Sequence, residues 1–423
     1  MVLRIPKPSI STFFAIIPIL YFNSCTFEFI KASSIVLPIV ALSALLWCGF
    51  LLRENITNLV HRVFPMILCL LFFGMLFLFG VQNHISVFTN DISNMLYLMF
   101  FMCVFVVYSD EYYENDRKVI LSIWLVDTII ASVYSAIRLI NDPTLSRMLS
   151  TGSYHSTSAA SAARGIVSFG VIYGLTLVLI VLFSLIINKK GKMLFNIILF
   201  ALFTLVLFLA QFTIAILLVG VGVLCVFVIN NKNGTVNMQT RFFVLAIVGI
   251  CLVFISPFLM QIIVESEIFG YEVNARLEEI MTFFSGGSLE GTDLLVRFMQ
   301  YFTSLGALVS SFGLGKMVVT SLEVGGHSQW FDGLGNYGIF YIIYLVAVIS
   351  FARYVTQTMP DKGSSQLYKL IFLIYIIMSI PNTSTWAPIT LSLFVIVPFL
   401  CMEMVAERKP EMELVIERKV SRI

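Results

Sequence analysis

The chain has 423 residues, of which 59% are hydrophobic and only 12% are charged, and its mean hydropathy is +0.96. This composition excludes a soluble globular protein of this length and indicates a polytopic membrane protein. The formal net charge of +2 gives no reason to expect a nucleic-acid partner. The seven cysteines form no CxxC motif, so neither disulfides nor a structural zinc site is expected.

Apolar runs long enough to cross a bilayer recur along the whole chain. A hydrocarbon core of about 30 Å needs about 17 to 25 apolar residues in a helix, because backbone polar groups must be satisfied within the segment. The run 193–229 is too long for one crossing and is divided at Gln211, where a polar side chain marks a tight turn. Twelve spans result, at residues 9–22, 32–52, 63–81, 92–108, 119–140, 165–187, 193–209, 212–229, 242–263, 333–353, 367–381 and 386–404.

The basic residues orient these spans, since Lys and Arg near span ends stay on the cytoplasmic side. With both termini inside, the inner segments hold 19 of the 26 Lys and Arg residues and the outer segments hold the other seven. The first span lacks a small-residue cleavage site, so it is expected to be uncleaved. The predicted protein is all-α: spans one to nine in 1–263 with a smaller outer loop at 141–163, a large helical periplasmic loop at 264–332, spans ten to twelve in 333–404, and a cytoplasmic tail at 405–423.

The large outer loop is acidic, with nine Asp and Glu residues against three Lys and Arg residues. Its two arginines, Arg276 and Arg297, are therefore not part of a general basic surface. A planar guanidinium binds phosphate in a bidentate manner, which makes both residues candidate phosphate ligands. Asp293 lies four residues before Arg297, and a surface ion pair between them is the simpler interpretation.

Two helices are predicted within this loop. The first begins with Asn274 as its N-cap and ends at Gly286-Gly287. The second begins with Thr292 as its N-cap, and Arg297 lies off its apolar face. That face consists of Leu294, Leu295, Phe298, Tyr301, Phe302 and Leu305.

A polar cluster with flanking glycines follows, where the loop meets the tenth span. His327 lies in this cluster, directly before Ser328, which is the expected N-cap of the next helix. A histidine in such surroundings is a candidate general base, although a lone histidine at a helix start is more often structural. Asp332 is a candidate for orienting it. The nearby glycines are expected to let the backbone approach a ligand closely.

The smaller outer loop ends in an arginine. Arg164 lies at the mouth of the sixth span and is followed by Gly165 and Ser168. An arginine anchored at the membrane interface explains this position as well as a functional role does. His155 in the same loop is read as structural.

An outward loop with spaced arginines, a Gly-x-Gly turn and the run His-Ser-x-Trp-x-Asp resembles the O-antigen polymerase (Wzy) and O-antigen ligase superfamily. The span count and the position of the loop agree with this resemblance. The motif is short and degenerate, whereas the topology covers the whole chain. The residues that carry the resemblance are Gly313, Gly315, His327, Ser328, Trp330, Asp332 and Gly338.

The resemblance implies a GT-C-like fold in the bacterial inner membrane and a role in lipopolysaccharide biosynthesis. The implied reaction joins oligosaccharide repeat units, with a chain on undecaprenyl pyrophosphate as the donor and a second lipid-linked unit as the acceptor. His327 would be the base, oriented by Asp332. Three arginines would bind the pyrophosphate, namely Arg164, Arg276 and Arg297. A chain-length regulator of the Wzz type and a flippase of the Wzx type are the implied partners.

Neither a metal nor another cofactor is expected, because no DxD-type carboxylate pair faces outward and arginine would take the role of the metal. Tyr301 and Trp330 are candidates for stacking on sugar rings, and they are equally good packing residues.

Two alternatives stay open. The first is the ligase of the same superfamily, which would share the arginines and the histidine. The second is a flippase or another transporter, which places ionisable residues at the bilayer midplane. Asp127 in the fifth span is the one clear case of such a residue, with Arg138 further along the same span.

Overall fold

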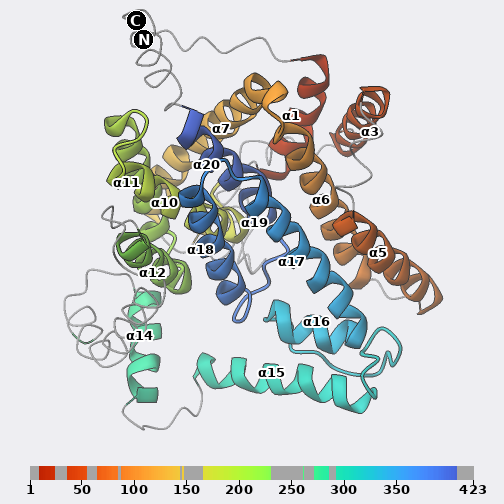
Figure 1. Cartoon of the computed structure of the whole chain (residues 1–423). Helices are drawn as coiled ribbons and strands as arrows, with labels where there is room; N and C mark the ends of the chain where they lie inside the picture. The colour runs from red at the N-terminus through yellow and green to blue at the C-terminus, as the bar shows by residue number, and fades with distance from the viewer. Residues whose placement is uncertain are drawn as a thin grey trace, which may run out of the picture.

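Figure 1 shows the computed structural model of the chain, which describes residues 9–23, 36–54, 64–83, 87–142, 145–146, 165–229, 261, 271–284 and 292–406. Every regular element within these ranges is a helix, as predicted. The helices from the first to the eighth predicted span are α1 (Ile10–Asn23), α3 (Val36–Glu54), α5 (Phe64–Asn83), α6 (Val87–Tyr108), η1 (Glu111–Tyr113), α7 (Glu114–Asn141), α10 (Phe169–Ile187), α11 (Met193–Leu209) and α12 (Thr213–Ile229). Those that follow are α14 (Tyr271–Phe284), α15 (Asp293–Ser310), α16 (Gln329–Tyr337), η2 (Gly338–Phe340), α17 (Tyr341–Thr358), α18 (Lys362–Met378), α19 (Ala387–Leu391), η3 (Ser392–Ile396) and α20 (Val397–Ala406).

The observed helices follow the predicted apolar runs closely. The run 193–229 is divided into α11 and α12, and Gln211 between them adopts a left-handed conformation with φ of 58°. This is the predicted break. Apart from Gln261, the ninth predicted span lies outside the described residues.

Three helical stretches are long and apolar enough to cross a membrane: Glu111–Asn141, Phe169–Ile187 and Gln329–Thr358. Seven shorter apolar helices of 10–17 residues accompany them in the described part of the chain. These stretches indicate association with a membrane. That all twelve predicted spans cross it stays a prediction.

α10 lies in the centre of the bundle. In its most apolar window 78% of the residues are buried inside the protein, against 50% for Glu111–Asn141 and 44% for Gln329–Thr358. It packs against α11, α12, α18 and the last helical segment, α19–η3–α20. The continuous apolar sequence of α10 is therefore explained by contact with protein on nearly all sides.

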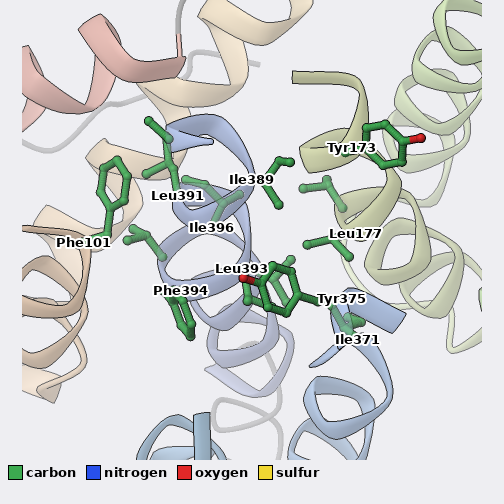
Figure 2. Packing of buried hydrophobic residues seen from close by; sticks show 14 of the residues in the cluster. Phe101, Tyr173, Leu177, Ile371, Tyr375, Ile389, Leu391, Leu393, Phe394 and Ile396 are labelled. Atoms are coloured by element: carbon green, nitrogen blue, oxygen red, sulfur yellow. The ribbon is translucent and has the colours of Figure 1, made fainter. Parts of the chain in front are cut away.

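The contact between α10 and the last helical segment is close. In Figure 2, Leu177 extends from α10 toward the segment that carries Ile389 and Leu393, whereas the Tyr173 ring points away from it. A Cβ atom on Gly174 would lie 2.6 Å from Oγ of Ser392. The small residue thus lets the two helices approach, as small residues commonly do between membrane helices.

α15 lies across one end of the bundle, beside α16 (Figure 1). α16 continues through η2 into α17, which runs into the bundle. The predicted loop 264–332 therefore contributes two helices to this end, and part of the predicted tenth span begins as a separate short helix.

Candidate functional site

The caps of α15 and α16 position the candidate residues. The Thr292 hydroxyl accepts a hydrogen bond from the Leu295 N–H at 3.3 Å, and the Ser328 hydroxyl accepts one from the Phe331 N–H at 3.2 Å. Each bond satisfies a backbone donor that the helix itself leaves free. Both predicted N-caps are confirmed.

α14 differs from its prediction at its start. The helix begins at Tyr271, so Asn274 lies inside it and the prediction that Asn274 is the N-cap is wrong. No helix breaker precedes Asn274 between Tyr271 and Val273, so the helix extends beyond the expected cap. Arg276 belongs to α14, and only its place on the helix is described. The predicted stop at Gly286-Gly287 lies outside the described residues.

The glycines near the site allow two backbone segments to pack directly against each other. The Ile339 N–H donates to the Gly313 carbonyl at 2.8 Å, which joins the segment after α15 to η2, directly before α17. A Cβ atom on Gly315 would lie 2.6 Å from the backbone nitrogen of Gly338. The expectation that these glycines admit a ligand is therefore corrected for Gly315 and Gly338, because the chain itself occupies the space.

Asp332 joins three parts of the site. Its Oδ1 accepts a hydrogen bond from the Ser304 hydroxyl of α15 at 2.6 Å, and its Oδ2 accepts one from the Ser328 N–H at 2.6 Å. Ser304 also accepts a hydrogen bond from the Gly325 N–H at 3.0 Å. The carboxylate is 8% exposed and Ser304 is fully buried. This network fixes α15, α16 and the glycine turn relative to one another, since buried polar groups are costly when unpaired.

His327 is exposed and directly precedes Ser328, whose N–H donates a hydrogen bond to Asp332. Among the described residues, neither oxygen of Asp332 bonds to the His327 imidazole; they bind Ser304 and Ser328. The carboxylate therefore positions the backbone that carries His327, in place of the direct contact with the ring that we expected. An exposed imidazole beside a fixed backbone remains able to accept a proton from a bound hydroxyl group.

The short connection between α18 and α19 brings Arg297 and the start of α16 together. The Gln329 N–H donates to the carbonyls of Ser379 and Asn382, both at 3.1 Å. Nη1 of Arg297 lies 3.5 Å from the Pro381 carbonyl oxygen, which is a long hydrogen bond. His327 is two residues from Gln329, so the Arg297 guanidinium and the backbone close to His327 lie beside the same connection.

The connection 379–386 did not appear among the predicted site residues. Two signals could have found it: the polar run Asn382-Thr383-Ser384-Thr385, and the predicted topology, which places the segment between spans eleven and twelve on the same side as the large outer loop. Both signals are visible without the structure.

Arg164 lies outside the described residues. The chain becomes described at Gly165, and α10 begins shortly afterwards at Phe169. The Phe169 ring centroid lies 6.2 Å from that of Trp386, at the end of the connection 379–386. The segment that follows Arg164 thus lies beside the connection that Arg297 also reaches.

The two candidate aromatic residues make contacts within the protein. The Tyr301 ring stacks on Phe331 with a centroid separation of 5.1 Å. The Trp330 indole nitrogen is buried, and the residue lines an internal cavity of about 20 Å³ together with Gln329 and Tyr344. A cavity of this size admits about one water molecule. These contacts favour packing roles for both residues.

Asp127, which is predicted to lie within the fifth span, belongs to a buried polar group between α1 and α7. Its Oδ2 accepts a hydrogen bond from the Asn23 side-chain amide at 3.0 Å, and Asn23 accepts one from the Trp124 indole N–H at 2.9 Å. The Arg138 guanidinium lies 5.9 Å from the centroid of the Tyr134 ring on the same helix. The hydrogen bonds of Asp127 therefore link α7 to α1, so this buried carboxylate has a structural role.

No group of three or more His, Cys, Asp or Glu residues in the described part of the chain could hold a metal ion. No protein-family model matches the chain, and a search of curated proteins found no match either.

Proposed function

We propose that the chain is a metal-independent glycosyltransferase of the O-antigen polymerase type, which joins undecaprenyl-pyrophosphate-linked oligosaccharide units at the periplasmic face of the inner membrane. The observation that carries the proposal is the arrangement around the connection 379–386. Arg297 and the helix start next to His327 both lie beside it, at one end of a bundle of apolar helices. The pyrophosphate and sugars of a lipid-linked substrate lie at the membrane surface. The polar residues that act on them must therefore lie at an end of such a bundle.

The proposed reaction needs one base and one site for an anionic leaving group. The His327 imidazole takes the proton from the acceptor hydroxyl as that oxygen attacks the anomeric carbon of the donor sugar. The bond between this carbon and the pyrophosphate oxygen breaks, and undecaprenyl pyrophosphate leaves with the bonding electrons. The Arg297 guanidinium stabilises the negative charge on that leaving group. Asp332 positions the His327 backbone.

Arg276 and Arg164 complete the proposed pyrophosphate site. The stretch after Arg164 reaches the connection 379–386 through Phe169 and Trp386, which supports including Arg164. Arg276 is included for its charge in an otherwise acidic loop. A chain-length regulator of the Wzz type and a flippase of the Wzx type are the proposed partners in the cell.

The test is reconstitution of the purified protein in liposomes with its lipid-linked repeat unit, followed by sizing of the glycan products. Wild-type protein is expected to give chains of several units, whereas His327→Ala and Arg297→Ala are expected to form polymer at least about 100 times more slowly. Glu323→Ala and Lys316→Ala are matched controls, because each removes a charge from the same segment outside the proposed site. Full-length polymer from both site variants at the wild-type rate would contradict the proposal.

The same liposomes separate the alternatives. Transfer of a finished glycan to a lipid A core acceptor, without growth of the lipid-linked chain, would identify a ligase. Movement of the lipid-linked unit across the bilayer, without glycan growth, would identify a transporter. Asp127→Asn keeps an oxygen that accepts from Asn23, so polymer formation is expected to persist in this variant.

A further inference from the structure

α15 buries small residues against the protein and turns large apolar side chains outward, with the exposed polar residues Thr303 and Ser310 among them. Ser304 and Ala307 are buried where α15 meets α16, whereas Phe302 and Val309 are 66% and 75% exposed. A helix on the surface of a soluble protein does the reverse. The outward side of α15 therefore requires an apolar surrounding.

The end of α15 places a large aromatic residue where glycine is usual. The Phe312 N–H donates to the Val309 carbonyl at 3.0 Å, and the Gly313 N–H donates to the Leu308 carbonyl at 2.8 Å. This pair of bonds defines a Schellman motif, whose first residue after the cap is left-handed and most often glycine. Here it is Phe312, with φ of 53° and a side chain that is 96% exposed. A strained, bulky and outward-pointing residue is a reason to look for a function.

The position of the C-terminal end of α15 relative to the bilayer follows from its link to the start of α17. The Gly313 carbonyl accepts from the Ile339 N–H, so Phe312 lies near the start of α17. η2 and α17 have 3 and 18 residues. At 1.5 Å per residue these 21 residues span about 30 Å, the thickness of the hydrocarbon core. The chain turns at Gly338, which has φ of 57°, so α16, and α15 beside it, lie at the end of this span, at the level of the membrane interface.

The apolar side of α15 is continuous with the outward side of α17. Ile339 of η2 and Ile342 and Val346 of α17 are exposed along one stripe. An apolar groove of about 420 Å³ joins this stripe to the end of α15, and its lining includes Leu308, Phe312, Leu334 and Ile342. The surface from Phe302 to the middle of α17 is thus one apolar face.

We propose that α15 is an interfacial helix that lies flat in the bilayer leaflet at this end of the bundle. Its outward side contacts lipid hydrocarbon, Phe312 inserts between acyl chains, and the groove accommodates an acyl chain of a bilayer lipid. Arg297 lies on the opposite side, where it is held at the level of lipid phosphates. This inference does not depend on the proposed chemistry.

The test uses single cysteine substitutions in nanodiscs. Phe302→Cys, Val309→Cys and Phe312→Cys probe the apolar side, and Ser321→Cys and Glu323→Cys are controls at exposed positions of the following segment. Wild-type protein with its seven native cysteines provides the background. A charged, membrane-impermeant maleimide is expected to react at least about ten times more slowly at the three apolar positions, because the thiolate that reacts requires water. In SDS the reaction rates of all five variants should converge.

A second measurement identifies what covers the positions at which the introduced cysteine reacts slowly with maleimide. A bimane label at Phe302→Cys or Phe312→Cys is expected to be quenched by lipids with brominated acyl chains, and a label at Ser321→Cys is not. Equal maleimide rates in the two sets would overturn the inference. Slow reaction without bromine quenching would overturn it as well, since another protein surface would then cover the face.

Discussion

The hydrogen bond of 2.6 Å between Ser304 Oγ and Asp332 Oδ1 connects the helix that carries Arg297 to the helix that follows His327. Asp332 Oδ2 holds the Ser328 N–H at the same time. The proposed leaving-group site and the proposed base are thus fixed in one unit, although they lie 30 residues apart in the sequence. Preorganisation of this kind is what a site for charge stabilisation requires.

Asp332→Ala is expected to destabilise the protein. The change leaves the buried Ser328 N–H without its acceptor, and the Ser304 hydroxyl keeps only the Gln300 carbonyl at 3.1 Å, at a cost of about 2 kcal/mol. Thermal unfolding of the purified protein in detergent measures the effect, and Glu323→Ala should show no change. Lost activity with unchanged stability would instead indicate that Asp332 acts directly in the chemistry.

Gly315→Ala is expected to lower stability more than any exposed substitution nearby. Gly315 has φ of 76°, and a Cβ atom would lie 2.6 Å from the backbone nitrogen of Gly338. The left-handed backbone and the clash together cost about 2 to 4 kcal/mol. Gly306→Ala is the matched control, because nothing lies within 4 Å of its added Cβ and the helix interior favours alanine by about 0.5 to 1 kcal/mol. Similar melting temperatures for the two variants would contradict the close contact.

Arg297→Lys tests whether charge alone suffices at the proposed pyrophosphate site. Lysine keeps the positive charge but lacks the planar donor pair that binds two oxygens at once. We expect kcat in the liposome assay to fall about tenfold for Arg297→Lys and about 100- to 1000-fold for Arg297→Ala. Lys316→Ala should leave kcat unchanged. Equal activity of wild type and Arg297→Lys would show that bidentate binding is not required.

Local features of this fold were predictable because their causes are local. An apolar run determines where a helix can lie in a membrane, so α11 and α12 begin and end close to the predicted residues. Thr292 and Ser328 cap their helices through hydrogen bonds to residues three positions away. Asn274 shows the limit of such signals, since a capping residue is also tolerated inside a helix.

Features that depend on contacts between distant segments were not predictable. The apolar stripe of α15 was recognised, but its periodicity does not tell whether the stripe faces protein or lipid. The role of Asp332 depends on Ser304, which lies 28 residues earlier. Gly315 lies close to Gly338 only because the segment after α15 folds back on the start of α17. The part played by the connection 379–386 likewise arises from packing.

Phe312→Gly and Phe312→Ala together isolate the backbone strain at the end of α15. Both variants remove the aromatic ring, so any contribution of lipid contact cancels in the comparison. Glycine adopts the left-handed conformation of Phe312 without steric penalty, whereas alanine does not. Phe312→Gly is therefore expected to be more stable than Phe312→Ala by about 1 kcal/mol, measured by thermal unfolding in one detergent. Equal stability of the two variants would mean that residue 312 is not left-handed, and the reason for regarding the exposed ring as a strained, functional feature would be lost.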